Sequence, residues 1–482
     1  MSTSPSESAR LAISAADNAT EIFLIDANLR RIASGLGQLE ASVNPGIYKV
    51  RFRSGASQHD QLVEVSRPGE RVTVQGPPVL FRTAAPIDAT LTTHEYQSGP
   101  AAEVSKRIHL NVGTGGGLFV FVREEDEDQA FLASGLTVHA LDGTELAALE
   151  AGETDIQARW GALNLGLDPG TYSIRVVSGR RGSYEIFATV SRGWQTQVFL
   201  LMDEFWSERE PFRAPSLRSA SVLMSRQGQG FDPYSDNVRL AELARHGLAQ
   251  GRNIVSSRLM NEFLYGKFED PMLGVIAAHL LMRRRRPDRR LLHVVSGNLF
   301  KILGEHPDLQ ALLIAMKIGV GRRIESFERP PSLRQSWDNI VKASRRRATL
   351  VQPDSPIARI ADGVMTGGPW LIHRIDKVSQ TSRTHNASIA EAERVVEQLI
   401  SVDPDRFREM IEQTRSGEED LSGLERGVLA AAMSYALGRR LKTGEEQQSA
   451  RSKAKKMFSD LSAPSYSIAN AVISVADKMK LS

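Results

Sequence analysis

Two stretches of the chain alternate between apolar and polar residues, and the same turn precedes both of them. Residues 44–55 read NPGIYKVRFRSG and residues 168–179 read DPGTYSIRVVSG. The period of two residues predicts strands with one buried face. The Pro-Gly pair ahead of each strand predicts a type II turn in which the glycine takes a positive φ. We infer that the front half of the chain holds a duplicated all-β module.

A second match sets the extent of each module. VSRPG at residues 65–69 corresponds to VSRG at 190–193, and a further apolar segment follows each of them. Each module is expected to be a small antiparallel β-sandwich. The first is placed at residues 8–80 and the second at 106–203, with linkers at 81–105 and 204–235.

The repeated unit also resembles a known kind of module. A Pro-Gly turn followed by a strand with YKVR at 48–51 or YSIR at 172–175 is similar to the PEGA and carboxypeptidase-regulatory-like β-sandwich modules that bacteria attach to larger proteins. This resemblance implies a spacer or a docking surface. It implies no catalytic residue.

Helical periodicity with proline-marked starts replaces the alternation after Asp203. Helices are expected at 271–283, 288–303, 306–319 and 330–344, and Asp270 before Pro271 has the sequence of a helix start. They form a predicted central α-helical domain at 236–345, which a linker or lid at 346–387 and a C-terminal helical bundle at 388–482 follow. The expected fold class is therefore multidomain, β then α: two small antiparallel β-sandwiches followed by α-helical domains.

Composition removes several classes of chemistry. The chain of 482 residues has no cysteine, which excludes disulfides, thiolate metal sites and cysteine nucleophiles. Its formal net charge of +3 gives no global argument for nucleic acid. No run approaches the roughly 18 to 20 apolar residues of a membrane span, and no secretory signal is recognisable, so a cytoplasmic location is expected.

The candidate catalytic patterns are weak. The string GTGGG at 113–117 precedes a strand, so it reads as a hairpin or bulge, and not as a phosphate loop, which needs a helix after it. The ten histidines include no pair at the i, i+4 spacing of a helical zinc site, and no G-x-S-x-G motif is present. We therefore assign no catalytic, cofactor-binding or metal-binding residue and no cofactor. His279, Glu269 and Asp270 remain as the groups that a hydrolase would use.

Two surface features are candidates for partner binding. The run RRRRPDRR at 283–290 concentrates positive charge in Arg283, Arg284, Arg285 and Arg286. It could neutralise a helix C-terminus, contact an acidic protein or the acidic run at 124–128 of this chain, or bind nucleic acid or an anionic membrane. The aromatic residues Phe205 and Trp206 stand among charges, where they could anchor a partner or seal a joint between domains.

A further resemblance concerns residues 80–345. The segments APIDATLTTHEYQ at 85–97, LFVFVREED at 118–126 and YGKFEDPMLGVIAAHLLM at 265–282, with HPDLQALL at 306–313 and PPSLRQSW at 330–337, are similar to uncharacterised bacterial proteins associated with caspase-like peptidase systems. The resemblance implies partnership with such a peptidase, and not peptidase chemistry.

The sequence hypothesis is a non-enzymatic multidomain interaction or adaptor protein, in a bacterial peptidase-linked signalling or defence assembly. Its expected partner is another protein, with a caspase-like peptidase as the candidate. The alternatives are a hydrolase with a site in the central helical domain and a nucleic-acid binder acting through Arg283 to Arg290, although the scarcity of aromatic residues, at 6%, disfavours nucleic acid.

Overall fold

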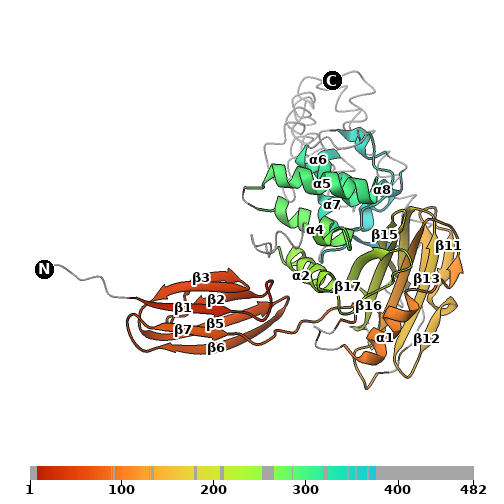
Figure 1. Ribbon diagram of the computed structural model, residues 1–482. Coiled ribbons are helices and arrows are strands. Elements are labelled where there is room, and N and C mark those ends of the chain that lie inside the picture. Colours follow the sequence, from red (N-terminus) through yellow and green to blue (C-terminus); the bar gives the residue numbers. More distant parts are fainter. Residues whose placement is uncertain are drawn as a thin grey trace, which may run out of the picture.

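Strands come first along the chain and helices gather in the later part, as the sequence predicts (Figure 1). The computed structural model describes residues 8–375, except for 88–89, 91–92, 130, 132–134, 178–181, 207–210, 252–264, 285, 318–323, 345–346, 353–354 and 366–367. The predicted C-terminal bundle at 388–482 lies outside the described residues.

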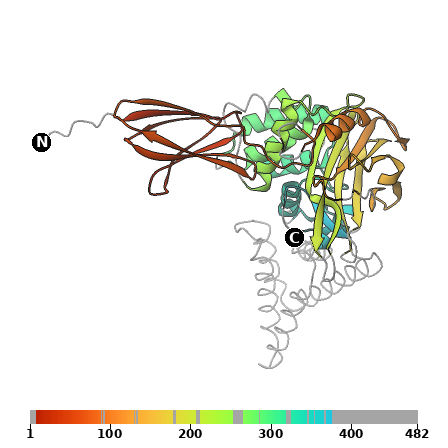
Figure 2. The same cartoon turned by 90° about the horizontal axis from the view of Figure 1, so that it is seen from below.

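The first module is a seven-stranded sheet that folds into two layers. Its strands are β1 (Ala9–Ser14), β2 (Glu21–Ile25), β3 (Arg31–Leu36), β4 (Gln38–Val43), β5 (Gly46–Ser54), β6 (Ser57–Val65) and β7 (Arg71–Gln75), in the spatial order β6-β5-β2-β3-β4-β1-β7. β3 and β4 share a single residue pair, so the sheet turns a corner there. Leu11, Ile22, Val50 and Phe52 are buried in its core. Figures 1 and 2 both show this module projecting from the remainder of the protein, and we call it the arm and the remainder the body.

The second module consists of two sheets that share one core. One sheet has the order β12-β13-β9-β16-β17, with β8 pairing β13, and the other has the order β11-β10-β14-β15-β18. The strands are β8 (Leu110–Asn111), β9 (Gly116–Arg123), β10 (Leu136–Ala140), β11 (Glu145–Ala148), β12 (Glu153–Asp155), β13 (Trp160–Leu167), β14 (Gly170–Val177), β15 (Ser183–Val190), β16 (Trp194–Trp206), β17 (Pro211–Arg226) and β18 (Ile372–Ile375). Every residue of β9 and β13 is buried, because this sheet is covered on both faces.

The repeated string forms the same corner in both modules. The Tyr48 hydroxyl donates to the Asn44 carbonyl at 2.7 Å, and the Tyr172 hydroxyl donates to the Asp168 carbonyl at 2.8 Å. The predicted type II turn is wrong, because Gly46 and Gly170 are the first residues of the extended strands β5 and β14. The tyrosine bond therefore holds each corner, in place of a left-handed glycine.

The sheets differ from the prediction in three respects. They are not purely antiparallel, since β1–β7, β8–β13 and β9–β16 are parallel pairs. Residues 204–235, expected as a linker, contain β17, which pairs with β16, and residues 346–387, expected as a linker or lid, contribute β18 to β15. The linker expected at 81–105 contains helix α1 (Glu95–Val104). Prolines at 211 and 215 hide the alternation of β17, and β18 joins its sheet from far along the chain.

The four predicted helices of the central region are present as α4 (Pro271–Met282), α5 (Arg289–Leu303), α6 (Pro307–Met316) and α7 (Arg334–Ser344). Two helices that were not predicted accompany them: α2 (Asp236–Ala249) before them and the short α8 (Pro356–Arg359) after them. Asp270 and Asp288 cap α4 and α5 as expected, and Gly304, with φ 65°, ends α5. α2 and α4 pack against β17, while Trp337 of α7 packs with Phe187 on the outer face of the other sheet.

Candidate functional site

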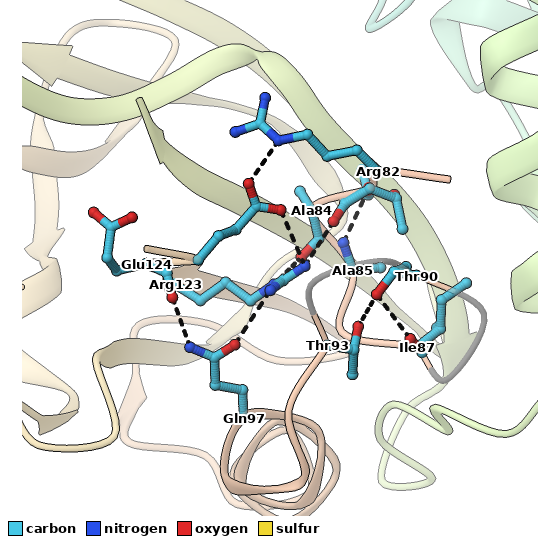
Figure 3. Close-up of polar contacts among 12 residues, drawn as sticks. Arg82, Ala84, Ala85, Ile87, Thr90, Thr93, Gln97, Arg123 and Glu124 are labelled. Carbon is cyan, nitrogen blue, oxygen red and sulfur yellow. Dashed lines mark hydrogen bonds and ion pairs between the residues drawn. The ribbon is translucent and has the colours of Figure 1, made fainter. Parts of the chain in front are cut away.

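A buried arginine lies at the joint between the arm and the body (Figure 3). Arg123 is the last residue of β9, and its guanidinium is fully buried. Nε donates to the Ala84 carbonyl at 2.9 Å, Nη2 donates to the Thr83 carbonyl at 2.7 Å, and Nη1 donates to Gln97 Oε1 at 3.2 Å. Burial lowers the pKa of Arg123 to about 10, so the group is still charged at neutral pH. We call this set of contacts the clamp, because it fixes the connecting segment, residues 81–93, and α1 to the sheet.

Figure 3 shows how the connecting segment and α1 converge on this group. The Gln97 side chain completes the clamp by donating Nε2 to the Glu124 carbonyl at 2.8 Å. Thr90 is bonded to the Ile87 carbonyl and to Thr93, so the segment also folds on itself. Main-chain and side-chain groups of the described residues thus both take part in hydrogen bonds where the chain leaves the arm.

A second buried cluster joins the same segment to α2 and β17. Glu242 Oε2 accepts hydrogen bonds from Ser221 Oγ at 2.7 Å, from Arg245 Nη2 at 2.7 Å and from the Thr83 hydroxyl. Burial disfavours the ionised carboxylate, but Arg245 and these hydrogen bonds outweigh that effect and hold the pKa of Glu242 below its usual value. Thr83 therefore belongs to both clusters, through its carbonyl and its hydroxyl.

Ion pairs surround the joint at the surface. Arg82 binds Glu125 at 2.6 Å and Asp203 at 2.8 Å, and Arg213 binds Glu124 at 2.6 Å. Glu124 and Glu125 of the acidic run at 124–128 are therefore paired with Arg213 and Arg82, and not with the described residues of the basic run at 283–290. Arg239 of α2 reaches the arm itself and pairs with Asp17 at 3.2 Å.

These clusters join the connecting segment to β9, α1, α2 and β17. The Ser221 hydroxyl donates to a carboxylate that is also paired with Arg245. Among the described residues, no group of three or more His, Asp or Glu side chains could hold a metal ion. No described helix is both long and apolar enough to cross a membrane.

The structure separates the three groups named for a hydrolase. Asp270 Oδ1 accepts from the backbone N–H groups of Met272 and Leu273 and from that of Met224 on the edge of β17, so this carboxylate caps α4 and joins it to the sheet. His279 lies nine residues further along the same helix, which corresponds to about 13 Å. Its Nε2 is 3.0 Å from Ser336 Oγ, and burial lowers its pKa to about 4. Glu269 is exposed and bonded to Asn237.

Two amides of the glycine string at 113–117 already have acceptors within the protein. The Thr114 N–H donates to Asp168 Oδ1 at 2.9 Å, and the Gly113 N–H donates to the Gly166 carbonyl at 2.9 Å. Gly116 and Gly117 begin β9. The string is the tight entrance to a strand, as the sequence indicates.

The basic run forms one surface with helix α7. Arg283 and Arg286 are exposed and Arg284 is half-buried at the turn between α4 and α5, while Arg285 lies outside the described residues. Arg283 Nη1 donates to Gln335 Oε1 at 3.2 Å. Burial raises the pKa of Asp338 although Arg334, Lys342 and Arg283 lie close enough to oppose this. We call Arg283, Arg284, Arg286, Arg334 and Lys342 the basic surface.

The aromatic pair lies at the end of β16. Phe205 is partly buried and packs on the main core, which favours a role in sealing the fold over a role as an exposed anchor. Trp206 belongs to β16 by its backbone, which pairs with Pro211, and its side chain lies outside the described residues.

The sequence reasoning missed Arg123, Thr83, Glu242 and Arg245. A signal for Arg123 was present, since it ends the otherwise apolar strand LFVFVR, where a charged residue needs a buried partner. Glu242 and Arg245 stand three residues apart on α2, a spacing that predicts an ion pair but not its burial.

Comparison with known proteins gives no family. No family model matches the chain, and no curated protein matches it. Among solved structures, the chain is similar to the Bacillus anthracis TIE protein with a TM-score of 0.15 and 11% identity, over 38% of this chain and 31% of that one. A likeness of this size carries no argument about function.

Proposed function

We propose that this protein is a non-enzymatic interaction protein that holds an arm and a body in a fixed relation and recruits a partner protein. The observation that carries this proposal is the clamp. A buried arginine costs several kcal/mol in desolvation unless its donors are all used, and Arg123 uses its donors on the carbonyls of the connecting segment. A molecule that fixes its connecting segment in this way keeps two surfaces at one separation.

The body offers the basic surface to a partner. Its arginines extend from a turn over the neighbouring helix, and its side chains are exposed or half-buried. Arginine suits the recognition of carboxylates, because its planar fork makes two parallel hydrogen bonds. We propose an acidic face of a partner protein as the ligand, and the resemblance to proteins of caspase-like peptidase systems makes such a peptidase the candidate.

The test is capture of a partner by the full chain and by matched variants. Arg283→Glu, Arg284→Glu and Arg286→Glu together reverse the charge of the turn, and Arg192→Glu with Arg218→Glu reverses two exposed arginines elsewhere. All lysates are nuclease-treated, and the captured protein is then purified and titrated against each variant. We expect binding to be lost only with the first variant and to weaken with salt. Equal binding to all three proteins refutes the basic surface as the docking site.

Two further experiments separate the alternatives. A chain ending at Thr384 tests whether the predicted C-terminal bundle is required for capture. Alanine at His279, Glu269 and Asp270 tests the hydrolase, because a substrate that the parent chain cleaves and this variant does not would restore that reading.

A further inference from the structure

The arm carries a groove that none of these contacts uses. It lies on the outward face of the three neighbouring strands β4, β1 and β7, with a volume of about 370 Å³. Arg10, Ala12, Glu40, Ser42 and Arg71 are among the residues that line it. Ala12 stands between Glu40 on β4 and Thr73 on β7 in the strand register, and its small side chain leaves the hollow open.

Two arginines stand side by side at this groove. Arg10 and Arg71 are register partners on the parallel strands β1 and β7, and both are exposed. Like charges on neighbouring strands destabilise a sheet. Within the described part of the chain, no carboxylate lies within ion-pair distance of either guanidinium. The pair therefore costs the arm stability, and no described contact offsets that cost.

Two acids close to the arginine pair, among the residues that the structure describes, are bonded elsewhere or offset along the strand. Glu70 precedes Arg71, but its Oε2 accepts from the backbone N–H groups of Ser66 at 2.9 Å and Arg67 at 3.1 Å. Glu40 is the register partner of Ala12, so it stands one row away from Arg10. The groove thus has a positive end at the two arginines and a negative side at Glu40.

The groove lies at the free end of the arm. Arg10 and Arg71 are at the starts of β1 and β7, and Ser42 is near the end of β4. The contacts with the body are at the other end of these strands, where Asp17 follows β1 and meets Arg239, and Gly55 follows β5 and faces the His246 ring. Figure 1 shows this free end directed away from the body.

We propose that this groove binds carboxylate side chains of an acidic segment in a partner protein. The paired guanidinium groups receive a carboxylate, the Ser42 hydroxyl can donate a further hydrogen bond, and Glu40 accepts from a backbone N–H or an ammonium group of the same segment. A nucleic acid fits less well, because the described residues that line the groove include no aromatic side chain on which bases could stack, and Glu40 repels phosphates. This site is separate from the basic surface and goes beyond the proposed function.

The test is fluorescence anisotropy of the full chain with a fluorescein-labelled oligoglutamate peptide. Arg10→Gln with Arg71→Gln should weaken binding at least tenfold, which corresponds to about 1.4 kcal/mol. Arg30→Gln, an exposed arginine of the same module, is the control and should bind as the parent does. The thermal midpoint of the double variant should be unchanged or higher, because the repulsion between the arginines is gone.

Three results would overturn the inference: equal affinity of the double variant and the parent, the same loss with Arg30→Gln, or an oligothymidylate of equal length binding as tightly and losing affinity in parallel. Each measurement is repeated in the background of the Arg283, Arg284 and Arg286 charge reversal, so that peptide bound at the basic surface does not contribute. Failure here leaves partner capture by the basic surface unaffected, and failure of that capture leaves this site unaffected.

Discussion

Arg123 is buried, and each of its three guanidinium nitrogens donates a hydrogen bond. Its contribution to the free energy of unfolding can be measured by a substitution that keeps the charge. Arg123→Lys supplies one ammonium group where three nitrogens now bond to Thr83, Ala84 and Gln97. Acceptors left unsatisfied in the interior cost about 1–3 kcal/mol each. We expect the free energy of unfolding in urea to fall by about 3 kcal/mol. Arg192→Lys, at an exposed position, should leave it unchanged, and an equal loss in both variants would contradict the clamp.

Asp270 gives the protein a pH dependence with a defined sign. Burial raises the pKa of this carboxyl from its ordinary 3.8 to about 7, so the folded state binds the proton more tightly than the unfolded state does. The stability that this group contributes is present in full below about pH 4 and is lost as the pH rises through about 7.

Asp270→Asn should remove this dependence. Oδ1 makes all three of the hydrogen bonds and Oδ2 has no partner among the described residues, so an amide can keep the cap without the charge. Between pH 5 and pH 8, unfolding in urea should show the parent losing stability relative to the variant, by an amount on the order of a few kcal/mol. Parallel curves would show that Asp270 is ionised throughout.

At the scale of elements, alanine substitutions at two helical glycines should change the free energy of unfolding in opposite directions. A Cβ at Gly274 of α4 would stand 2.6 Å from Lys267 Cβ and 2.9 Å from Leu299 Cδ2 of α5, whereas a Cβ at Gly297 of α5 would meet nothing within 4 Å. Gly274→Ala should therefore lower the free energy of unfolding by about 1–3 kcal/mol through overpacking. Gly297→Ala should raise it by about 0.5–1 kcal/mol through helix propensity. Chemical denaturation of both variants checks the close approach of α4 and α5, and a gain in both would refute it.

The edge of β17 shows what sequence reasoning could and could not supply at this scale. Asp270 as a helix cap followed from the Asp-Pro pair, because capping depends on neighbours in the chain. Asp270 also accepts from the Met224 N–H, and Trp370 Nε1 donates to the Ala220 carbonyl at 2.6 Å. Both bonds cover the edge of β17, a strand that the sequence pattern did not reveal. These contacts span 46 and 150 residues of sequence, and no local pattern carries them.

For the whole molecule, we expect the ion pair between Arg239 and Asp17 to restrict the movement of the arm relative to the body. The pair is partly exposed, so Arg239→Gln should change global stability by no more than about 1 kcal/mol. It should nevertheless widen the distribution of distances between the arm and the body. Because the chain has no cysteine, spin labels at Glu64→Cys and Gln229→Cys report that distance by pulsed electron resonance without further changes. Arg30→Gln is the control, and an unchanged width in Arg239→Gln would show that the pair does not hold the arm.

The order of the modules was predictable, and their connection was not. Alternation and helical periodicity gave the sequence of β and α regions, and the repeated string marked the two corners that Tyr48 and Tyr172 close. The joint escaped prediction because residues 81–93 look like a linker: their partners Arg123, Ser221 and Glu242 are spread over the second module and α2. Hydrogen bonds between polar residues that are so far apart in the sequence produce no periodic pattern along the chain.

The clamp has a consequence for how such a protein can change over time. Arg123 recognises the carbonyl groups of Thr83 and Ala84, which every amino acid possesses, and no side chain of the arm itself takes part. The clamp therefore does not depend on the side chains of the arm, whereas the pair between Asp17 and Arg239 does. A different β-module joined ahead of residue 81 would keep the clamp and lose that pair, so an exchange of the arm by recombination, or by design, should leave the fold of the body intact and hold the new module less firmly.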